Sequence, residues 1–452
     1  MRGKITTVVI LSMCCCLQAE AQQEVQGTLT FRQAVNMGLE NNVALTMDRN
    51  QLAYTRVNKA SSMLQMGPAV NAFAGASRVI GNTFIQNTGE SISDGVTDGL
   101  SASIDAQMPI FNGLGQMHRY KQANSQNEAQ LYQVARSTQD VIRDVARQYL
   151  QCLMDEQLVK INRQNVETRK KQYEQIEAQV DLGSMAEADL YTQEYQVKNA
   201  ELLLVRAKNR LRNDMALLAQ IIQVDPAELL ELEQPDWDFN TLAADTLSLE
   251  NMYAVAVDTR SDLKQASYAE DAAHFGYSAT KGRYYPSLTA GASFGSGYNY
   301  RRGDINRSFD EQFNSLNKSL RFSLSLRIPI YSALSTRSQT AFSRVSYENA
   351  KVQHKAAEVA VKADVLLAYQ NFKDAVSSYE ASQAQLRAAE LSFKTEQERY
   401  FLSISDVVQL SVANQSYVAA QSDYQGALFT MMFQKLLVNY ALGTLKVEDI
   451  PE

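Results

Sequence analysis

Histidine is the side chain that most often binds metals or moves protons near neutral pH, and this 452-residue chain has three, His118, His274 and His354. They lie far apart in the sequence, and none belongs to an H-E-x-x-H or similar metal-ligand spacing. The chain also lacks a phosphate-binding P-loop and a Cys/His pair that would indicate a nucleophile. We therefore expect no enzymatic activity, no cofactor and no metal site.

Two further candidates for chemistry have simpler explanations. Gly113-Leu114-Gly115 begins like a dinucleotide-binding loop, but the third glycine of that motif is absent. Asp155 and Glu156 are paired acids, yet they fall in a helical pattern, where a solvated face is the expected environment. If the protein transports anything, the energy must come from a partner.

The first residues predict a secretory signal peptide over 1–21, cleaved after Ala21. Arg2 and Lys4 precede an apolar run over 5–17, and Ala19-Glu20-Ala21 has the A-x-A pattern of a cleavage site. We expect no lipid anchor at Cys14, because the preceding methionine is a poor residue before a modified cysteine. The one cysteine beyond this segment, Cys152, predicts a small core residue and no disulfide framework. The formal net charge of −7 and the absence of a Lys/Arg-rich block argue against nucleic acid as a partner.

The rest of the chain contains one unit twice. Residues 29–45 align with 247–263, and Pro68 aligns with Pro286, at a spacing of 218; Pro109 aligns with Pro329 at a spacing of 220. We therefore expect a first structural repeat over 22–246 and a second over 247–452. Each repeat is predicted to contain helices, two strands and two long helices: 29–66, 69–80, 100–110, 113–182 and 186–222 in the first, and 249–283, 286–300, 320–330, 333–401 and 405–441 in the second. The polar segments 81–99 and 301–319 are expected to be exposed hairpin loops.

The predicted strands alternate apolar and polar residues, which indicates one apolar and one wet face. Tyrosines at 284–285 and again at 298 and 300 are separated by roughly the width of a bilayer for a tilted strand. The apolar positions are therefore expected to face lipid, among them Leu100, Ile104, Leu288, Phe294, Phe322, Leu324 and Leu326. Four strands cannot close a barrel, and lipid does not tolerate open sheet edges, so the chain must oligomerise.

The long helices indicate an elongated molecule. A helix over 116–181 would be roughly 100 Å long, and Gly183 is the one glycine between Gly115 and Pro226, where the chain is expected to reverse. A secreted, elongated coiled-coil structural protein would explain the helices but not the alternating strands. A membrane barrel extended by a helical cylinder explains both.

Together these features resemble the TolC-type outer-membrane efflux and secretion channels. The resemblance rests on the duplicated layout, on the strand-to-helix corners at Pro109, Gly113 and Pro329, and on the helix-hairpin tips at 180–197 and 398–417. It implies a mixed α/β membrane protein that forms a homotrimer, with a twelve-stranded barrel in the outer membrane of a Gram-negative bacterium and a twelve-helix barrel in the periplasm. It also implies a passive exit channel of a tripartite efflux pump or type I secretion system, docked to a periplasmic adaptor protein and an inner-membrane pump.

The resemblance places the adaptor contacts at the two tips: Leu182, Gly183, Ser184 and Asp189 in the first, and Leu402, Ser403, Ile404 and Asp406 in the second. The second tip has Ser403 where the first has Gly183, a departure from the family pattern. Asp189 and Asp406 begin the returning helices, where a carboxylate favours the positive helix end. Glu396, Glu398 and Asp406 are also candidates for an acidic ring at the pore entrance, because each would occur three times in a trimer.

Overall fold

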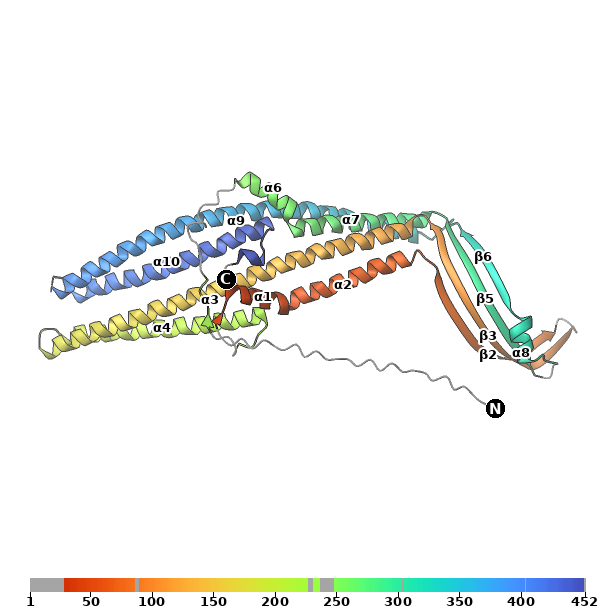
Figure 1. Cartoon of the computed structure of the whole chain (residues 1–452), viewed down its shortest axis with the longest axis horizontal. Helices are drawn as coiled ribbons and strands as arrows, with labels where there is room; N and C mark the ends of the chain where they lie inside the picture. Colours follow the sequence, from red (N-terminus) through yellow and green to blue (C-terminus); the bar gives the residue numbers. More distant parts are fainter. Residues whose placement is uncertain are drawn as a thin grey trace, which may run out of the picture.

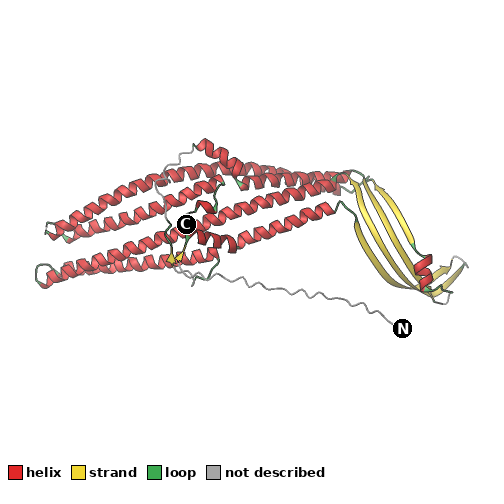
Figure 2. Cartoon of the chain, viewed as in Figure 1, coloured by secondary structure: helices red, strands yellow, loops and turns green. Residues whose placement is uncertain are grey.

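We describe a computed structural model of the chain, which covers residues 28–85, 89–226, 231–235, 248–302, 305–402 and 404–450. The predicted signal peptide and Ser403 lie outside these residues. The molecule is elongated, with long helices running side by side toward one end and a four-stranded sheet at the other (Figures 1 and 2).

The two halves of the chain contain the same elements in the same order. The first half has α1 (Phe31–Asn41), α2 (Val43–Leu64), β2 (Ala69–Ile85), β3 (Glu90–Asn112), α3 (Gly115–Asp181) and α4 (Glu187–Ile222). The second has α6 (Leu249–Thr259), α7 (Ser261–Lys281), β5 (Ser287–Arg301), β6 (Ser319–Arg327), α9 (Ser335–Phe401) and α10 (Val407–Leu442). The short elements are β1 (Thr28–Leu29), β4 (Glu231–Leu232), η1 (Gly282–Tyr284), α8 (Phe309–Glu311), η2 (Gln312–Leu316) and η3 (Val447–Asp449). Both α3 and α9 have 67 residues, and both α4 and α10 have 36.

The strands form one antiparallel sheet in the order β2-β3-β5-β6. Residues that pair across antiparallel strands share a face. Ile104 pairs with both Ala72 and Phe294, and Ala292 pairs with Phe322, so the apolar positions of all four strands lie on one face. The other face carries most of the polar and glycine positions, together with Phe73 and Val79 of β2.

The strand boundaries differ from those predicted. The segment 81–99 is not a loop, because β2 continues to Ile85 and β3 begins at Glu90. The predicted strand 100–110 is therefore the second half of a much longer one, which continues to Asn112 with a bulge between Pro109 and Phe111. The predicted strand 320–330 ends early, at Arg327, because this residue pairs with Ser287, the first residue of β5, and no other strand in the described part of the chain lies beside 328–330. The segment 301–319 contains α8 and η2.

The helical boundaries need smaller corrections. The predicted helix 29–66 is interrupted at Asn42, which ends α1 and caps α2 by accepting a hydrogen bond from the Leu45 N–H at 3.0 Å. The predicted helix 249–283 is interrupted in the same way at Arg260. The long helices begin and end within two residues of their predicted bounds.

The main core lies halfway along the helices, where α1, α3, α4 and α10 meet. This core buries the apolar residues that recur at helical spacing in α3, which are Val141, Val145, Tyr149 and Leu153. Cys152 is also buried here, as predicted. The Tyr149 ring stacks on Phe31 at 4.7 Å, and its hydroxyl lies within hydrogen-bonding distance of the Leu29 and Glu233 carbonyl oxygens. This core therefore fastens the β1-β4 pair and the start of α1 to the long helix.

No helix among the described residues combines the length and the apolar character that crossing a membrane requires.

Candidate functional site: the sheet face, the corners and the helical tips

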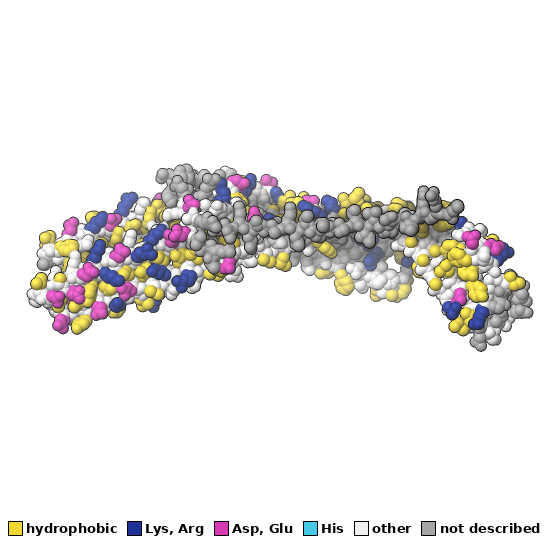
Figure 3. Space-filling model, turned by 60° about the horizontal axis from the view of Figure 1, so that its bottom comes forward, with side chains coloured by type: hydrophobic (Ala, Val, Ile, Leu, Met, Phe, Trp, Pro, Cys, Tyr) yellow, Lys and Arg dark blue, Asp and Glu magenta, His cyan; other side chains and the backbone are white. Residues whose placement is uncertain are grey.

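The seven residues predicted to face lipid all lie on the apolar face of the sheet. They are Leu100 and Ile104 in β3, Leu288 and Phe294 in β5, and Phe322, Leu324 and Leu326 in β6. Apart from the half-buried Leu288, all are exposed in the single chain. Hydrophobic side chains gather over the part of the sheet visible in Figure 3, whereas charged side chains of both signs are interspersed over the tips of the helices. The sheet thus presents a continuous apolar surface that a single chain leaves uncovered.

The opposite face of the sheet is polar. The Asp105 carboxylate in β3 accepts hydrogen bonds from Ser103 at 2.8 Å and from Ser293 of β5 at 2.6 Å. Ser293 lies in the sequence GASFG, which has the G-x-S-x-G spacing of a hydrolase nucleophile. It sits in the middle of a strand and donates to a carboxylate, whereas the hydrolase motif requires a sharp strand-to-helix turn and a histidine base. This face is therefore a wet surface, without hydrolase geometry.

Polar and aromatic groups mark both ends of the apolar face. Beyond Leu100, Arg78 donates two hydrogen bonds to Asp98, at 2.6 and 2.8 Å, and Tyr298 packs edge-on against Phe309 at 5.3 Å. Tyr284, Tyr285, Phe111 and Tyr331 are exposed at the other end, next to the helices. Aromatic residues in these positions are typical of the two interfaces of a membrane-spanning sheet.

The first strand-to-helix corner depends on glycine. Pro109 pairs with Thr289 within the sheet, and the chain then turns through Gly113, with φ of 64°, and Leu114, with φ of 62°. A Cβ on Gly113 would overlap the carbonyl oxygen of Gly282 and lie 2.8 Å from the Cβ of Tyr285. The backbones of the two halves therefore touch at this corner, and only glycine permits the contact.

The second corner turns at the equivalent residues without glycine. Ala333 has φ of 45° and Leu334 φ of 65°. Pro329 follows the end of β6 and belongs to no strand, unlike its counterpart Pro109. Among the described residues β6 is an edge strand, so no strand lies beside this corner as β5 lies beside the first one.

The first helical tip reverses where the sequence predicted. Gly183 has φ of +72°, and Ser184 donates from both its backbone N–H and its hydroxyl to the Gln179 carbonyl. Asp189 does not cap the returning helix: the N-cap is Ala186, and Asp189 lies in the first turn of α4, where its charge still favours the helix end. Leu182 is 83% exposed.

The second tip has a similar shape with different chemistry. Asp406 caps α10, since its Oδ1 accepts the Gln409 N–H at 2.7 Å. Leu402 and Ile404 are exposed, and Ser403 between them lies outside the described residues. Both tips therefore present large apolar side chains to solvent at the end of the molecule farthest from the sheet (Figure 1).

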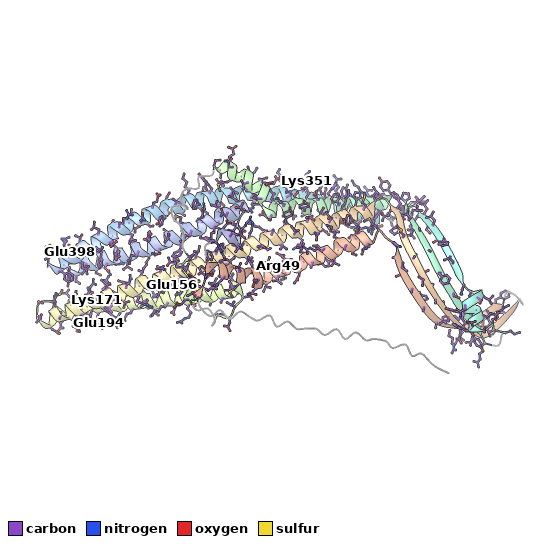
Figure 4. All side chains as sticks on the ribbon, in the orientation of Figure 1. Arg49, Glu156, Lys171, Glu194, Lys351 and Glu398 are labelled. Atoms are coloured by element: carbon purple, nitrogen blue, oxygen red, sulfur yellow. The ribbon has the colours of Figure 1, made fainter. Side chains whose placement is uncertain are left out.

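The three acidic residues of the predicted entrance ring differ in their surroundings. Glu396 accepts from Arg399 at 3.2 Å and from the Ser405 hydroxyl, so it is held within the tip. Asp406 is the helix cap. Glu398 is exposed near the end of the α9–α10 hairpin, at the same end of the molecule as Lys171 and Glu194 of the other hairpin (Figure 4). The structure thus leaves Glu398 as the freest carboxylate of the predicted set.

Polar contacts join the two hairpins. Arg169 of α3 is buried and donates to the Ser411 hydroxyl at 3.1 Å and to the Ser411 carbonyl at 3.3 Å, both in α10. Burial lowers the pKa of Arg169, because the guanidinium lies among neutral groups. Nearer the tips, the Tyr400 hydroxyl approaches the Met185 sulfur at 4.0 Å. These contacts hold the two hairpins side by side within one chain.

Asp155 corrects the prediction of a solvated acid pair, because its side chain is only 1% exposed. It lies 3.1 Å from Arg210 of α4 and accepts from Gln151 at 3.2 Å. Burial, together with the neighbouring Asp214, raises its pKa to about 7. The group joins α3 to α4 inside a hairpin.

The histidines pack between helices. His354 contacts Glu270 at 2.8 Å, His274 lies against Tyr347, and His118 stacks near Phe275. Across the described ranges no group of three or more His, Cys, Asp or Glu residues could hold a metal ion.

An extended sheet with one exposed apolar face, joined by tight corners to helical hairpins about 50–100 Å long, defines a membrane channel protein with a long helical extension. The family model described as "Outer membrane efflux protein" matches residues 34–222 and 252–428, and the chain belongs to this family. It is therefore an outer-membrane exit channel of a Gram-negative bacterium and a passive conduit, not an enzyme. The alternative of a secreted coiled-coil structural protein is excluded.

Individual proteins of known sequence or structure are also similar to this chain. "Outer membrane protein TolC" of Vibrio cholerae is 22% identical over 318 residues, covering 70% of this chain and 71% of that protein. The crystal structure of VceC, also from Vibrio cholerae, superimposes with a TM-score of 0.80 at 14% identity, over 91% of this chain and 96% of that one. The CmeC channel of Campylobacter jejuni gives 0.81 at 14% identity, over 92% and 85%. At these identities the structures support the fold alone.

Proposed function

We propose that three copies of the chain close into a single twelve-stranded barrel in the outer membrane, continued by a barrel of twelve helices in the periplasm. One chain supplies four strands whose outer edges, β2 and β6, are unpaired within the described sheet. Unpaired backbone groups at such an edge are costly in lipid, so the sheet must close through other copies. The polar face with Asp105 then lines the lumen.

We further propose that the two tips dock onto a periplasmic adaptor protein that connects the channel to an inner-membrane pump. The observation that carries this proposal is the exposure of large apolar residues at both tips, 83% for Leu182 and 69% for Leu402. Exposed apolar side chains clustered at the end of an otherwise polar helical hairpin are typical of an interaction site. Gly183, Ser184, Asp189, Ile404, Asp406 and Ser403 belong to the same proposed contact.

The docking proposal predicts that a Leu182→Asp/Leu402→Asp double variant loses the adaptor. Each carboxylate would have to be desolvated in the contact, so recovery of the adaptor after crosslinking should fall at least about tenfold. The measurement is pull-down of the tagged channel from cells, with mass spectrometry of the crosslinked partners.

The matched control is Leu182→Met/Leu402→Met, which keeps the tips apolar at similar volume and should retain the adaptor. Size-exclusion chromatography with light scattering must show the same assembly for both variants, because the tips lie far from the sheet. Equal adaptor recovery from the two variants would overturn docking through these residues.

The acidic ring at the pore entrance belongs to the same proposal. Glu396 is occupied by Arg399 and Ser405, so Glu398 and Asp406 would supply most of the field that attracts cations. A combined Glu398→Gln/Asp406→Asn change that leaves cation selectivity unaltered would remove this role.

A further inference from the structure

The two β-hairpins of the chain have the same strand register. Ala69 of β2 pairs with Gln107 of β3, and Ser287 of β5 pairs with Arg327 of β6. Ser287 lies 218 residues after Ala69, and Arg327 lies 220 after Gln107. These are the two spacings that also relate the helices: α6 begins 218 residues after α1, and α9 begins 220 after α3. The same two spacings therefore relate both the helices and the paired strand positions of the two halves.

The contact between the halves is made by β3 and β5. Ser103 pairs with Gly295, Ile104 with Phe294, and Gln107 with Gly291; past a bulge, Phe111 pairs with Leu288 and Asn112 with Ser287. Because β5 lies beside it, β3 continues to Asn112.

The equivalent continuation is missing from β6. This strand ends at Arg327, although the residue equivalent to Asn112 is Ser332. The intervening Ile330 is 96% exposed and Tyr331 is 83% exposed. The sequences of the two segments are similar, MPIFN against IPIYS, so the difference lies in the neighbour. Among the described residues no strand pairs with the outer edge of β6, and β2 is the other edge strand of the sheet.

We propose that β6 of one chain pairs with β2 of a second copy in the register that β3 makes with β5, and that β6 extends to Ser332 when it does so. Transferring the register by 220 and 218 residues places Ser323 opposite Ser77, Leu324 opposite Ala76, Arg327 opposite Phe73 and Tyr331 opposite Val70. This inference rests on the proposed trimer and assigns its subunit contact residue by residue.

The faces of the two strands agree with this register. It puts Leu324 and Leu326 beside Ala76 and Ala74 on the apolar face, and Ser323 beside Ser77 on the polar face. The large-beside-small pairing also occurs inside the chain, where Leu324 pairs with Ala290. A slip by one residue would place the apolar row of one strand against the polar row of the other. The apolar and polar faces therefore exclude a register shifted by an odd number of residues. Among the even registers, the one that matches the β3-β5 pairing is selected by the internal repeat.

A groove beside β2 marks where the second corner would pack. Within the chain, the corner at Gly113 contacts Gly282 and Tyr285, whose counterparts in the first half are Leu64 and Gly67. These two residues line a surface groove together with neighbouring residues of α2 and the start of β2, and with Gln107 and Pro109 of β3. The counterpart of Gly113 is Ala333, so the Ala333 corner of a second copy would occupy this groove. With a methyl group at 333 and a leucine at 64, this contact needs more room than the backbone contact inside the chain.

Disulfide trapping tests the register. Ser77→Cys is combined in turn with Arg321→Cys, Ser323→Cys and Ser325→Cys in the full chain, purified from membranes and oxidised. Directly opposite residues have Cβ atoms about 4.5–5.5 Å apart, whereas the diagonal neighbours are about 7–8 Å apart, too far for an unstrained disulfide. The Ser77/Ser323 pair should therefore give reducible crosslinks between subunits at least about fivefold faster than the two shifted pairs. The native Cys152 is buried, and single-cysteine variants control for it.

A second pair, Val70→Cys with Tyr331→Cys, tests the extension of β6 and should also crosslink. Light scattering of the unoxidised proteins tests whether trimers form, independently of the strand register between subunits. If trimers form but a shifted pair crosslinks faster, or no pair does, the register is wrong while the trimer stands. If no trimer forms, the proposed assembly itself is wrong, and the register with it.

Discussion

Gly113→Ala is expected to destabilise the folded chain by about 3 kcal/mol or more, which for a protein of ordinary stability approaches loss of folding. A left-handed φ costs a residue with a Cβ about 1–2 kcal/mol. The new methyl group would also overlap the Gly282 carbonyl oxygen and press on Tyr285, and overpacking costs a further 1–3 kcal/mol or so. The measurement is the Tm of the purified protein by circular dichroism at 222 nm, together with its yield in the outer-membrane fraction.

Two other glycines separate the contributions. Gly183 has nearly the same backbone conformation, with φ of +72°, but nothing lies within 4 Å of a Cβ built on it, so Gly183→Ala should cost only about 1–2 kcal/mol. Gly426, in α10, is equally open and has no positive φ, so Gly426→Ala should be neutral or stabilise by about 0.5–1 kcal/mol. Equal losses at Gly113 and Gly183 would show that the two halves do not pack closely at the corner.

Arg260→Met is expected to destabilise the chain by about 1.5–3 kcal/mol, because it removes charge-assisted hydrogen bonds and leaves two partly exposed carboxylates, Asp262 and Asp364, without their cation. Arg260 is 2% exposed and lies between α6 and α7. Its guanidinium bonds Asp262 in α7, Asp364 in α9 at 3.0 Å and the Ala441 carbonyl in α10 at 3.4 Å. One side chain thus fastens the short helices of the second half to the long hairpin, and its loss should lower the Tm accordingly.

The dependence of the folded protein's stability on pH, below about pH 4, provides a second test of the Arg260–Asp262 pair. Burial alone would raise the pKa of Asp262, but its bonds to Arg260 outweigh this and hold the pKa below the ordinary value of 3.8. The stabilisation is therefore present above about pH 4 and is lost as the pH falls through the lowered pKa. The variant should lack this component of acid sensitivity.

Two controls distinguish the loss of the buried Arg260 from the loss of an ordinary surface ion pair. Arg399→Met removes an arginine that also bonds an acid, Glu396, but this arginine is 48% exposed and the Ser405 hydroxyl still donates to the acid, so the change should cost less than about 1 kcal/mol. Adding Asp262→Asn and Asp364→Asn to Arg260→Met should recover part of the loss, because the unpaired charges disappear. Equal costs for Arg260→Met and Arg399→Met would contradict the role of the cluster.

The sequence predicts the fold well where apolar residues recur with the period of a strand or helix, or where one residue type marks a turn. Alternation from Leu100 to Met108 predicts a strand because apolar and polar residues then fall on opposite faces of the sheet. Gly183 predicts the first tip because nothing else in that long helical pattern readily adopts a left-handed turn. The sequence predicts a loop over 81–99, where β2 and β3 in fact continue, because these residues lack the alternation of apolar and polar side chains that marks the rest of the strands.

The buried polar groups could not be predicted because burial there depends on tertiary contacts. Asp155 follows the helical pattern of a surface acid until α4 brings Arg210 and Asp214 against it. Arg169 and Arg260 are ordinary arginines in the sequence, and only the approach of α10 to each of them reveals a fastening role. The early end of β6 could not be predicted either, because it depends on the position of the strand at the edge of the described sheet.

The most direct test of an outer-membrane exit channel is electrical recording of the purified full-length protein in a planar lipid bilayer. Discrete, uniform conductance steps are expected, carried by trimers and favouring cations, with the preference reduced in Glu398→Gln/Asp406→Asn. Correctly folded protein that inserts into the bilayer and conducts no ions under any applied voltage would contradict the assignment.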